Sequence, residues 1–403
     1  MKKILMFAVL GMLCISGMAQ KNKKKQVEEG FVFTVVKENP ITSIKNQNRA
    51  GTCWSYSALA FIESELIRLG KGEYDLSEMY IVHNTYLDRA DKAVRTHGDA
   101  SFSQGGSFYD VIYAMKHYGL VPEAEMRPGV MYGDTLSNHN ELTQVSDAVV
   151  AAIAKGKQRS MQTDANGMPL WKKAIEAVHD IYLGKRPEKF TYNGKEYTPK
   201  SFYESTGLNA DDYVSLTSYT HHPFYSQFVL EIQDNWRWAL SYNLPIDELM
   251  EVFDHAIMEG FTIAWGSDVS EDGFTRDGIA VLPDQAKVIE ELAGSDMARW
   301  LKLSPAEKNM INQPRPQKWV SQEERQIAYD NWQTTDDHGM QIYGIAKDQD
   351  GNEYYMVKNS WGPAGKYKGI WYASKAFARY KTMNIIVHKD ALPKHIAKKL
   401  GLK

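Results

Sequence analysis

The sequence predicts an α+β protein in which a helical region precedes a region of antiparallel strands. After Cys53, the apolar residues Ala58, Ile62 and Leu66 recur at the spacing of one helix face. Residues 338–358 contain two apolar segments on either side of a polar turn, a pattern typical of a hairpin. With 403 residues, of which 43% are hydrophobic, the chain has material for a large core, so disorder as its main state is excluded.

Residues 1–19 are expected to form a cleaved signal peptide. Two lysines precede an apolar run at 4–13, and small residues follow at 17–19. We therefore expect export to the periplasm or out of the cell. A lipid anchor on Cys14 is a weaker alternative, because the bulky Leu13 precedes it. The apolar run is too short to span a bilayer, and the rest of the sequence contains no apolar run of spanning length. We therefore expect no stable membrane insertion.

Charge and cysteine content exclude several classes of function. Lys and Arg number 47 against 50 Asp and Glu, so no basic excess indicates a nucleic-acid partner. Two cysteines exclude a disulfide scaffold and multi-cysteine metal sites, and we expect neither a metal nor an organic cofactor. Loss of the signal peptide would leave Cys53 as the only thiol, which therefore has no intramolecular disulfide partner.

Cys53 is expected at the first turn of a helix that ends near Gly70. The polar residues 48–52 precede it and are expected to form a loop. The positive end of the helix dipole favours a thiolate, so a lowered thiol pKa is expected. Many free cysteines are simply small buried apolar residues, but the junction of a loop and a helix favours a nucleophile.

His338 stands at the start of the first predicted strand, and Asn359 stands at the end of the second. The two residues are symmetric about position 348.5, within the predicted turn, so their side chains are expected to be neighbours. An Asn oxygen beside an imidazole fixes its tautomer, and Trp361 would shield that bond from water. On these residues alone, an ordinary polar hairpin end remains the alternative.

Together, these segments resemble the papain-like cysteine peptidases. Residues 47–54 (QNRAGTCW) are similar to the family's nucleophile segment, and 359–362 (NSWG) match its Asn-Ser-Trp-Gly motif. Ala50 stands where secreted members carry a second cysteine, so their disulfide is absent. The resemblance implies four catalytic residues: Cys53 as nucleophile, His338 as general acid and base, Asn359 as its orienting residue and Gln47 as oxyanion donor beside the Cys53 backbone N–H.

The segment 103–107 (SQGGS) resembles the Gly-Gly wall of the family's cleft, which pairs with the main chain of the substrate. The substrate-binding residues implied by the resemblance are Gly105, Gly106, Trp54 and Trp361.

Cys53 and His338 are 285 residues apart, whereas ordinary papain-like enzymes separate the pair by about 130–150. The extra length predicts a large insertion, which resembles the helical insertion of aminopeptidase C and bleomycin hydrolase. The expected fold is papain-like, with a helical subdomain and an antiparallel, barrel-like subdomain. We expect these divisions: 1–19 signal peptide; 20–40 polar linker and first strand; 41–125 helical subdomain; 126–260 helical insertion; 261–390 β-rich subdomain; 391–403 C-terminal arm.

The resemblance implies peptide hydrolysis through a Cys53 acyl-enzyme, with aminopeptidase activity favoured and a homo-hexamer possible. In that group the C-terminal carboxylate holds the amino group of the substrate. Here the chain ends in Lys403, whose ammonium would oppose that attraction, and a surface tail is the alternative. Endopeptidase activity stays open, as do the less favoured acyl transfer and non-catalytic peptide binding.

Overall fold

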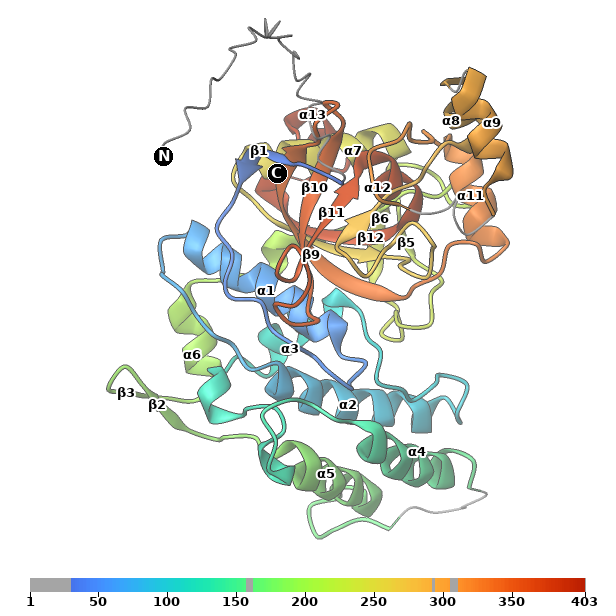
Figure 1. Ribbon diagram of the computed structural model, residues 1–403. Helices are drawn as coiled ribbons and strands as arrows, with labels where there is room; N and C mark the ends of the chain where they lie inside the picture. The colour runs from blue at the N-terminus through green and yellow to red at the C-terminus, as the bar shows by residue number, and fades with distance from the viewer. Residues whose placement is uncertain (1–29, 157–161, 292–293, 305–310, 403) are drawn as a thin grey trace, which may run out of the picture.

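The computed structural model describes residues 30–156, 162–291, 294–304 and 311–402 (Figure 1). The expected signal peptide, Cys14 and Lys403 lie outside these residues. The described chain has an α+β architecture, with a helical part and a part built on one large sheet. Helix α1 (Cys53–Arg68) lies between the two.

The helical part surrounds α1 on the side away from the sheet. The predicted face of α1 is buried, and so is most of its remaining surface, because α1 packs on helices and on the sheet together. The other elements of this part are α2 (Glu78–Arg95), α3 (Phe108–His117), η1 (Glu123–Glu125), η2 (Val130–Tyr132), α4 (Asn140–Ala154), α5 (Leu170–Leu183), the hairpin β2 (Phe190–Tyr192) and β3 (Lys195–Tyr197), α6 (Pro199–Thr206) and η3 (Ala210–Asp212).

The sheet is mainly antiparallel and runs in the order β5-β6-β4-β12-β7-β9-β10-β11-β8, with β1 added beside β9. Its strands come from distant parts of the chain. They are β1 (Thr34–Glu38), β4 (Tyr213–Thr217), β5 (Gln227–Val229), β6 (Leu240–Asn243), β7 (Ile263–Ser267), β8 (Ile279–Ala280), β9 (His338–Lys347), β10 (Glu353–Lys358), β11 (Ile370–Ser374) and β12 (Thr382–His388).

The two faces of the sheet bury different helices, because side chains alternate along a strand. On β7, Ala264 joins the core formed by α1, whereas its neighbours Ile263 and Trp265 join a second core. That second core also contains α7 (Ile246–Met258) and α13 (Lys394–Lys399). The nucleophile helix and the C-terminal helix therefore lie on opposite faces of the sheet.

The segment 126–260, expected as a helical insertion, also contributes strands to the large sheet. Residues 126–260 contain the helices α4 to α6, but they also contain β4, β5 and β6, which belong to the large sheet. Helix α7 packs on this sheet through Leu249, Val252 and Phe253. The helical patterns were recognisable, but the intervening strands have three to five residues each, too short for a clear alternation.

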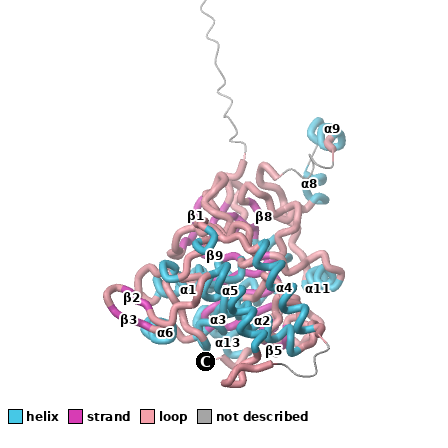
Figure 2. The backbone as a smooth tube through the Cα atoms, turned by 90° about the horizontal axis from the view of Figure 1, so that it is seen from below, coloured by secondary structure: helices cyan, strands magenta, loops and turns pink. Residues whose placement is uncertain are grey.

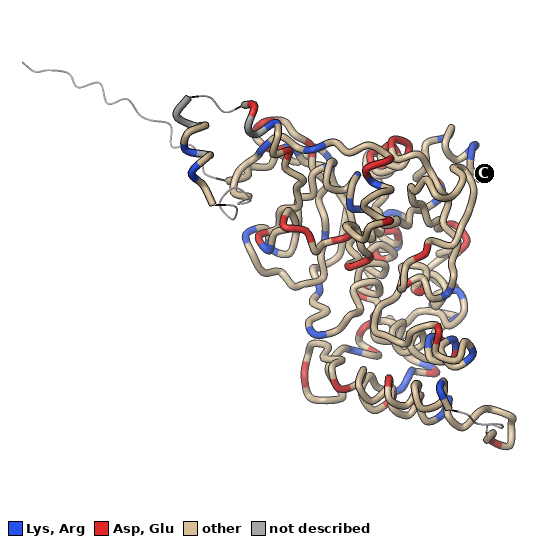
Figure 3. The backbone as a smooth tube through the Cα atoms, turned by 90° about the vertical axis from the view of Figure 1, so that its right-hand side faces the viewer, with Lys and Arg blue, Asp and Glu red and all other residues tan. Residues whose placement is uncertain are grey.

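Four further helices connect or follow the later strands: α8 (Gln285–Glu291), α9 (Gly294–Lys302), α11 (Gln322–Asp330) and α12 (Lys375–Lys381), followed by η4 (Lys389–Ala391). Figure 2 shows that α8 and α9 stand out from the rest of the molecule. Acidic and basic residues are interspersed along the chain (Figure 3). Within the described residues, every helix is too short or too polar to cross a bilayer.

Candidate active site

Cys53 is the first residue of α1, as the sequence predicted. Its backbone N–H belongs to the first turn, where N–H groups have no partner inside the helix. Gln104 ties the preceding loop to the Gly-Gly segment. Its side-chain oxygen accepts from the Gly51 N–H at 2.7 Å, and its backbone oxygen accepts from the Trp54 indole N–H at 3.0 Å.

His338 and Asn359 meet in a buried contact. The Asn359 Oδ1 accepts the Ser360 N–H at 2.7 Å, which fixes the orientation of the amide, and lies 2.7 Å from the His338 Nε2. The Nε2 must therefore carry a proton, which leaves Nδ1 as the basic nitrogen. The Trp361 ring covers the imidazole, with centroids 4.7 Å apart.

The hairpin register differs from the predicted one, although the two side chains do meet. Residues pair about position 350 near the turn, where Glu353 faces Lys347, and a bulge follows between Met356 and Val357. Asn359 lies beyond the last pair of β10, and its side chain reaches back to the start of β9. The predicted centre of the hairpin, at 348.5, differs from the observed centre near 350, so the predicted strand pairs are shifted from the observed ones.

Gln47 joins the nucleophile loop to the Asn359 segment. Its Oε1 accepts from the Ser360 hydroxyl at 2.6 Å, and its Nε2 donates to the Ala50 carbonyl at 2.8 Å. Since an amide nitrogen carries two protons, one remains for a ligand.

A narrow pocket brings Cys53 and His338 together. Gly106 forms its wall. The Trp54 ring packs against the α-carbon of Gly106 and is only 1% exposed. Trp54 therefore holds the wall in place and offers little surface to a substrate. The full lining is Cys53, Trp54, Gly106, Ser107, Phe108, Ile232, Asp234, Gly266, Asp336, Asp337, His338, Gly339 and Asn384.

Asp234 was not expected at the site. It lies in the connection 230–239, which we call the β5–β6 loop and which crosses from the sheet to the helical part. Arg237 anchors this loop on α2 and α3, through Asp88 at 2.7 Å and Asp110 at 2.5 Å. The polar, tryptophan-rich stretch IQDNWRW is the signal that the sequence offers for this loop.

The Asp234 carboxylate covers the Gly105–Gly106 wall. A Cβ on Gly105 would lie 2.2 Å from its Oδ2, so only glycine permits this approach. The Gly106 N–H donates to the carboxylate, and Arg89 donates to the Gly105 carbonyl. The wall's hydrogen-bonding groups are thus already partly occupied.

The pKa of the Cys53 thiol shifts opposite to the expected direction. Burial raises it to about 12, helped by the carboxylates of Asp234 and Asp336, while hydrogen bonds from the backbone of Gly339 and Trp54 lower it. Burial also lowers the pKa of His338 to about 4, against the hydrogen bond with Asn359. In the ligand-free protein burial therefore favours the neutral form of both groups.

The C-terminal arm packs on the face of the sheet opposite to Cys53. Ile396 and Leu400 are buried in the core formed with α7, and the Lys399 ammonium lies 2.7 Å from Glu248. The Leu402 N–H donates to the Ala397 carbonyl, which keeps the end of the described chain on α13. The described part of the arm, which extends to Leu402, thus follows the surface alternative and not a path into the cleft.

A cluster of His221, His222 and Glu231 has the composition of a metal site. However, Gln326 donates to the His221 Nδ1, so its Nε2 carries the proton that faces Glu231. This hydrogen bond makes the Nε2 of His221 a donor and not a metal ligand.

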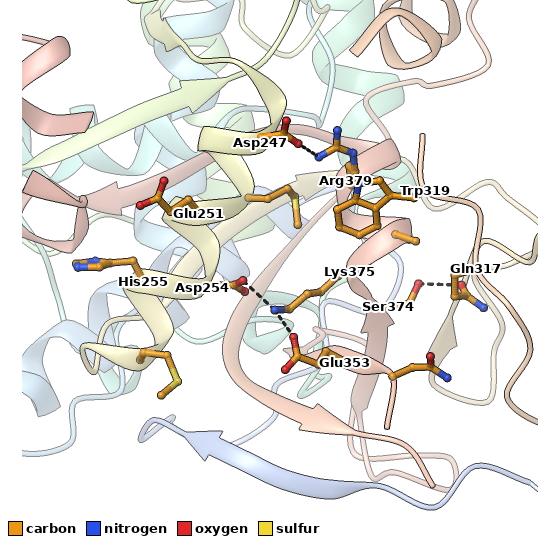
Figure 4. Close-up of a pocket in the computed structure, with 14 residues that line it drawn as sticks. Asp247, Glu251, Asp254, His255, Gln317, Trp319, Glu353, Ser374, Lys375 and Arg379 are labelled. Atoms are coloured by element: carbon orange, nitrogen blue, oxygen red, sulfur yellow. Dashed lines mark hydrogen bonds and ion pairs between the residues drawn. The ribbon is translucent and has the colours of Figure 1, made fainter. Parts of the chain in front are cut away.

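A larger pocket lies on α7, away from Cys53 (Figure 4). Its charged residues already pair with one another, as in Arg379 with Asp247 and Lys375 with Asp254 and Glu353. The pocket lining contains no cysteine, so the narrow pocket is the candidate active site.

The chain is similar to known proteins along most of its length. The model of the Peptidase C1-like family matches residues 8–283 and 319–402. Aminopeptidase C of Streptococcus thermophilus is 25% identical over 92% of this chain and 85% of that protein. Aminopeptidase G of Lactobacillus delbrueckii subsp. lactis is 22% identical over 94% and 88%.

The crystal structure of PepW from Lactobacillus rhamnosis superposes with a TM-score of 0.64, at 20% identity over 91% of this chain and 84% of that one. This likeness confirms the predicted fold. The chain therefore belongs to the Peptidase C1-like family, as a papain-like cysteine peptidase of the aminopeptidase C and bleomycin hydrolase group.

Proposed function

We propose that this peptidase is an exported aminopeptidase that removes residues from the N-terminus of peptides. The observation that carries the proposal is the closure of the cleft by the β5–β6 loop at the Gly105–Gly106 wall. A peptide cleaved internally would have to extend along this wall and pair with its backbone groups. Asp234 and Arg89 already engage those groups, so the space favours a substrate that ends near the scissile residue.

In the proposed reaction, His338 takes the proton of Cys53, and the thiolate attacks the carbonyl carbon of the first peptide bond. The free N–H of Gln47 and the backbone N–H of Cys53 stabilise the oxyanion. The imidazolium then protonates the leaving amine, which yields an acyl-enzyme. Water, deprotonated by His338, hydrolyses this thioester and restores the thiol. Asn359 keeps Nε2 protonated and Nδ1 facing the reaction.

The relatives named aminopeptidases support this proposal over the endopeptidase alternative. The anchoring of the loop by Arg237 supports it as well, because opening the wall to a longer chain would break both of its carboxylate contacts.

The test compares one peptide with a free or an N-acetylated terminus, with cleavage products identified by mass spectrometry. We expect stepwise removal of N-terminal residues from the free peptide only. Equal cleavage of both peptides would establish an endopeptidase. Cys53→Ala should abolish hydrolysis while the fold and peptide binding are preserved, and a variant with a tenth of the parent rate would contradict the role of Cys53.

We propose export because of the signal-peptide pattern in residues 1–19. Mass spectrometry of the protein recovered from the cell envelope and medium should find a mature N-terminus at Gln20. A homo-hexamer, implied by the resemblance, is tested by light scattering of the purified mature chain, and a monomeric mass would reject it.

A further inference from the structure

We infer that Asp234 and Asp336 together bind the N-terminal ammonium of the substrate and so determine exopeptidase specificity. This inference rests on the proposed function and adds the residues that would impose it. Both carboxylates line the same pocket as Cys53 and His338. Asp234 lies on the β5–β6 loop, and Asp336 lies in the segment just before β9.

Asp234 is placed where the main chain of a longer substrate would run. It contacts the α-carbon side of Gly105 and accepts the N–H of Gly106. A terminal ammonium beside the scissile residue would meet this carboxylate directly. An acetylated terminus would instead bring a carbonyl oxygen and a methyl group against it, with electrostatic repulsion and a steric clash.

The charges around the pocket suit one additional cation. Arg89 partly balances Asp234, with 3.5 Å between Nη1 and Oδ1. Asp336 has no hydrogen-bond or ion-pair partner within the described part of the chain. Its neighbour Asp337 is engaged elsewhere, since it accepts the N–H groups of Val269 and Ser270. When both carboxylates are ionised, they and the one guanidinium leave a single negative charge.

The ionised form of Asp336 is unfavourable in the absence of a nearby cation. Burial and the nearby charge of Asp234 raise its pKa to about 8. A substrate ammonium would favour the ionised form, as opposite charges at short range do. The same ammonium would reduce the effect of both carboxylates on Cys53, whose pKa they raise. Binding of the correct terminus would thereby also help to form the thiolate.

In this chain, an anion for the substrate ammonium has to come from outside the described part of the C-terminal arm. The C-terminal arm packs through Ile396 and Leu400 on the far face of the sheet, so its described residues supply no anion to the cleft. The substrate class implied is peptides with a free, protonated α-amine. Acetylated and pyroglutamyl peptides, which carry no ammonium, should be excluded.

The test uses aminoacyl-coumarylamides with a free amine and their N-acetylated forms. In the variants Asp234→Asn and Asp336→Asn, kcat/KM for the free amine should fall roughly 10- to 100-fold, as expected for losing a charge-assisted hydrogen bond. The value for the acetylated substrate should stay the same or rise. The ratio of the two values, which reports discrimination, should collapse.

Glu231→Gln is the matched control, because it removes one charge from the edge of the same loop. Its carboxylate contacts His221 and His222 instead of the pocket, so discrimination should persist. Gly105→Ala provides a second route, since its Cβ would displace the Asp234 carboxylate. This variant should reproduce the effect of Asp234→Asn even if the latter folds poorly.

If both Asp variants and Gly105→Ala keep the discrimination of the parent, the inference is overturned while the aminopeptidase proposal stands. If the parent itself cleaves both substrates equally, the aminopeptidase proposal fails, and the inference fails with it. The two failures are therefore distinguishable from one set of measurements.

Discussion

Asn359→Ala is expected to lower kcat roughly 5- to 150-fold with little change in KM. The substitution removes the oxygen that lies 2.7 Å from the His338 Nε2 at a buried position, where Asn359 is 1% exposed. An unsatisfied buried polar group costs about 1–3 kcal/mol. At about 1.4 kcal/mol per tenfold change in rate, this cost gives the range above if it appears fully in the transition state.

The assay is steady-state hydrolysis of an aminoacyl-coumarylamide from pH 5 to 9. Asn359→Asp is the matched variant because it keeps an acceptor oxygen for Nε2 and should recover part of the lost rate. Its added negative charge should raise the pKa of His338 and shift the profile to higher pH. Parent-like activity of a folded Asn359→Ala variant, or inactivity equal to Cys53→Ala, would refute the orienting role.

Three further substitutions test the remaining features of the site. Gln47→Glu keeps the acceptor for Ser360 but loses the oxyanion donor, so kcat should fall roughly 100- to 1,000-fold, and an unchanged kcat would contradict the donor role. Asp234→Asn removes a charge that raises the pKa of Cys53, so iodoacetamide should alkylate the variant faster at pH 7; an equal or slower rate would oppose this coupling. Asp336 has a raised pKa when folded, so its own contribution to stability declines as pH rises from about 4 to about 8, and Asp336→Asn should remove this contribution. Urea unfolding should show a gain of ~1–3 kcal/mol at pH 8.5 and almost none at pH 4, and an equal gain at both would refute the assignment.

Local sequence predicted the elements that carry the catalytic candidates. The helix begins at Cys53 because an apolar face and a polar loop meet there, and both are visible in the sequence. The strands beginning at His338 and ending before Asn359 follow from their apolar segments and the turn between them. The pairing register of β9 and β10 could not be predicted in the same way, because the bulge after Met356 depends on the neighbouring strands and has no local signature.

The features that sequence could not supply arise from tertiary contacts. Burial decides the direction of the thiol pKa, and a helix dipole acting alone gives the opposite sign. Asp234 belongs to a loop whose position depends on the distant contacts of Arg237 with Asp88 and Asp110. A single Asp in such a loop reads as a solvent-exposed residue until the anchoring contacts are known.

The two faces of the sheet explain why the anchor for the substrate would reside on the β5–β6 loop. Helix α13 is bound to the α7 face by Ile396 and Leu400, and an arm held there cannot also reach the cleft without exposing these residues. Exposing two such side chains would cost about 3–6 kcal/mol, which the attraction between one carboxylate and one partly solvated ammonium does not offset. The β5–β6 loop faces no such conflict, since both of its ends lie in the sheet and Arg237 fixes its middle over the wall. A carboxylate on this loop can therefore hold the ammonium without any rearrangement of the core.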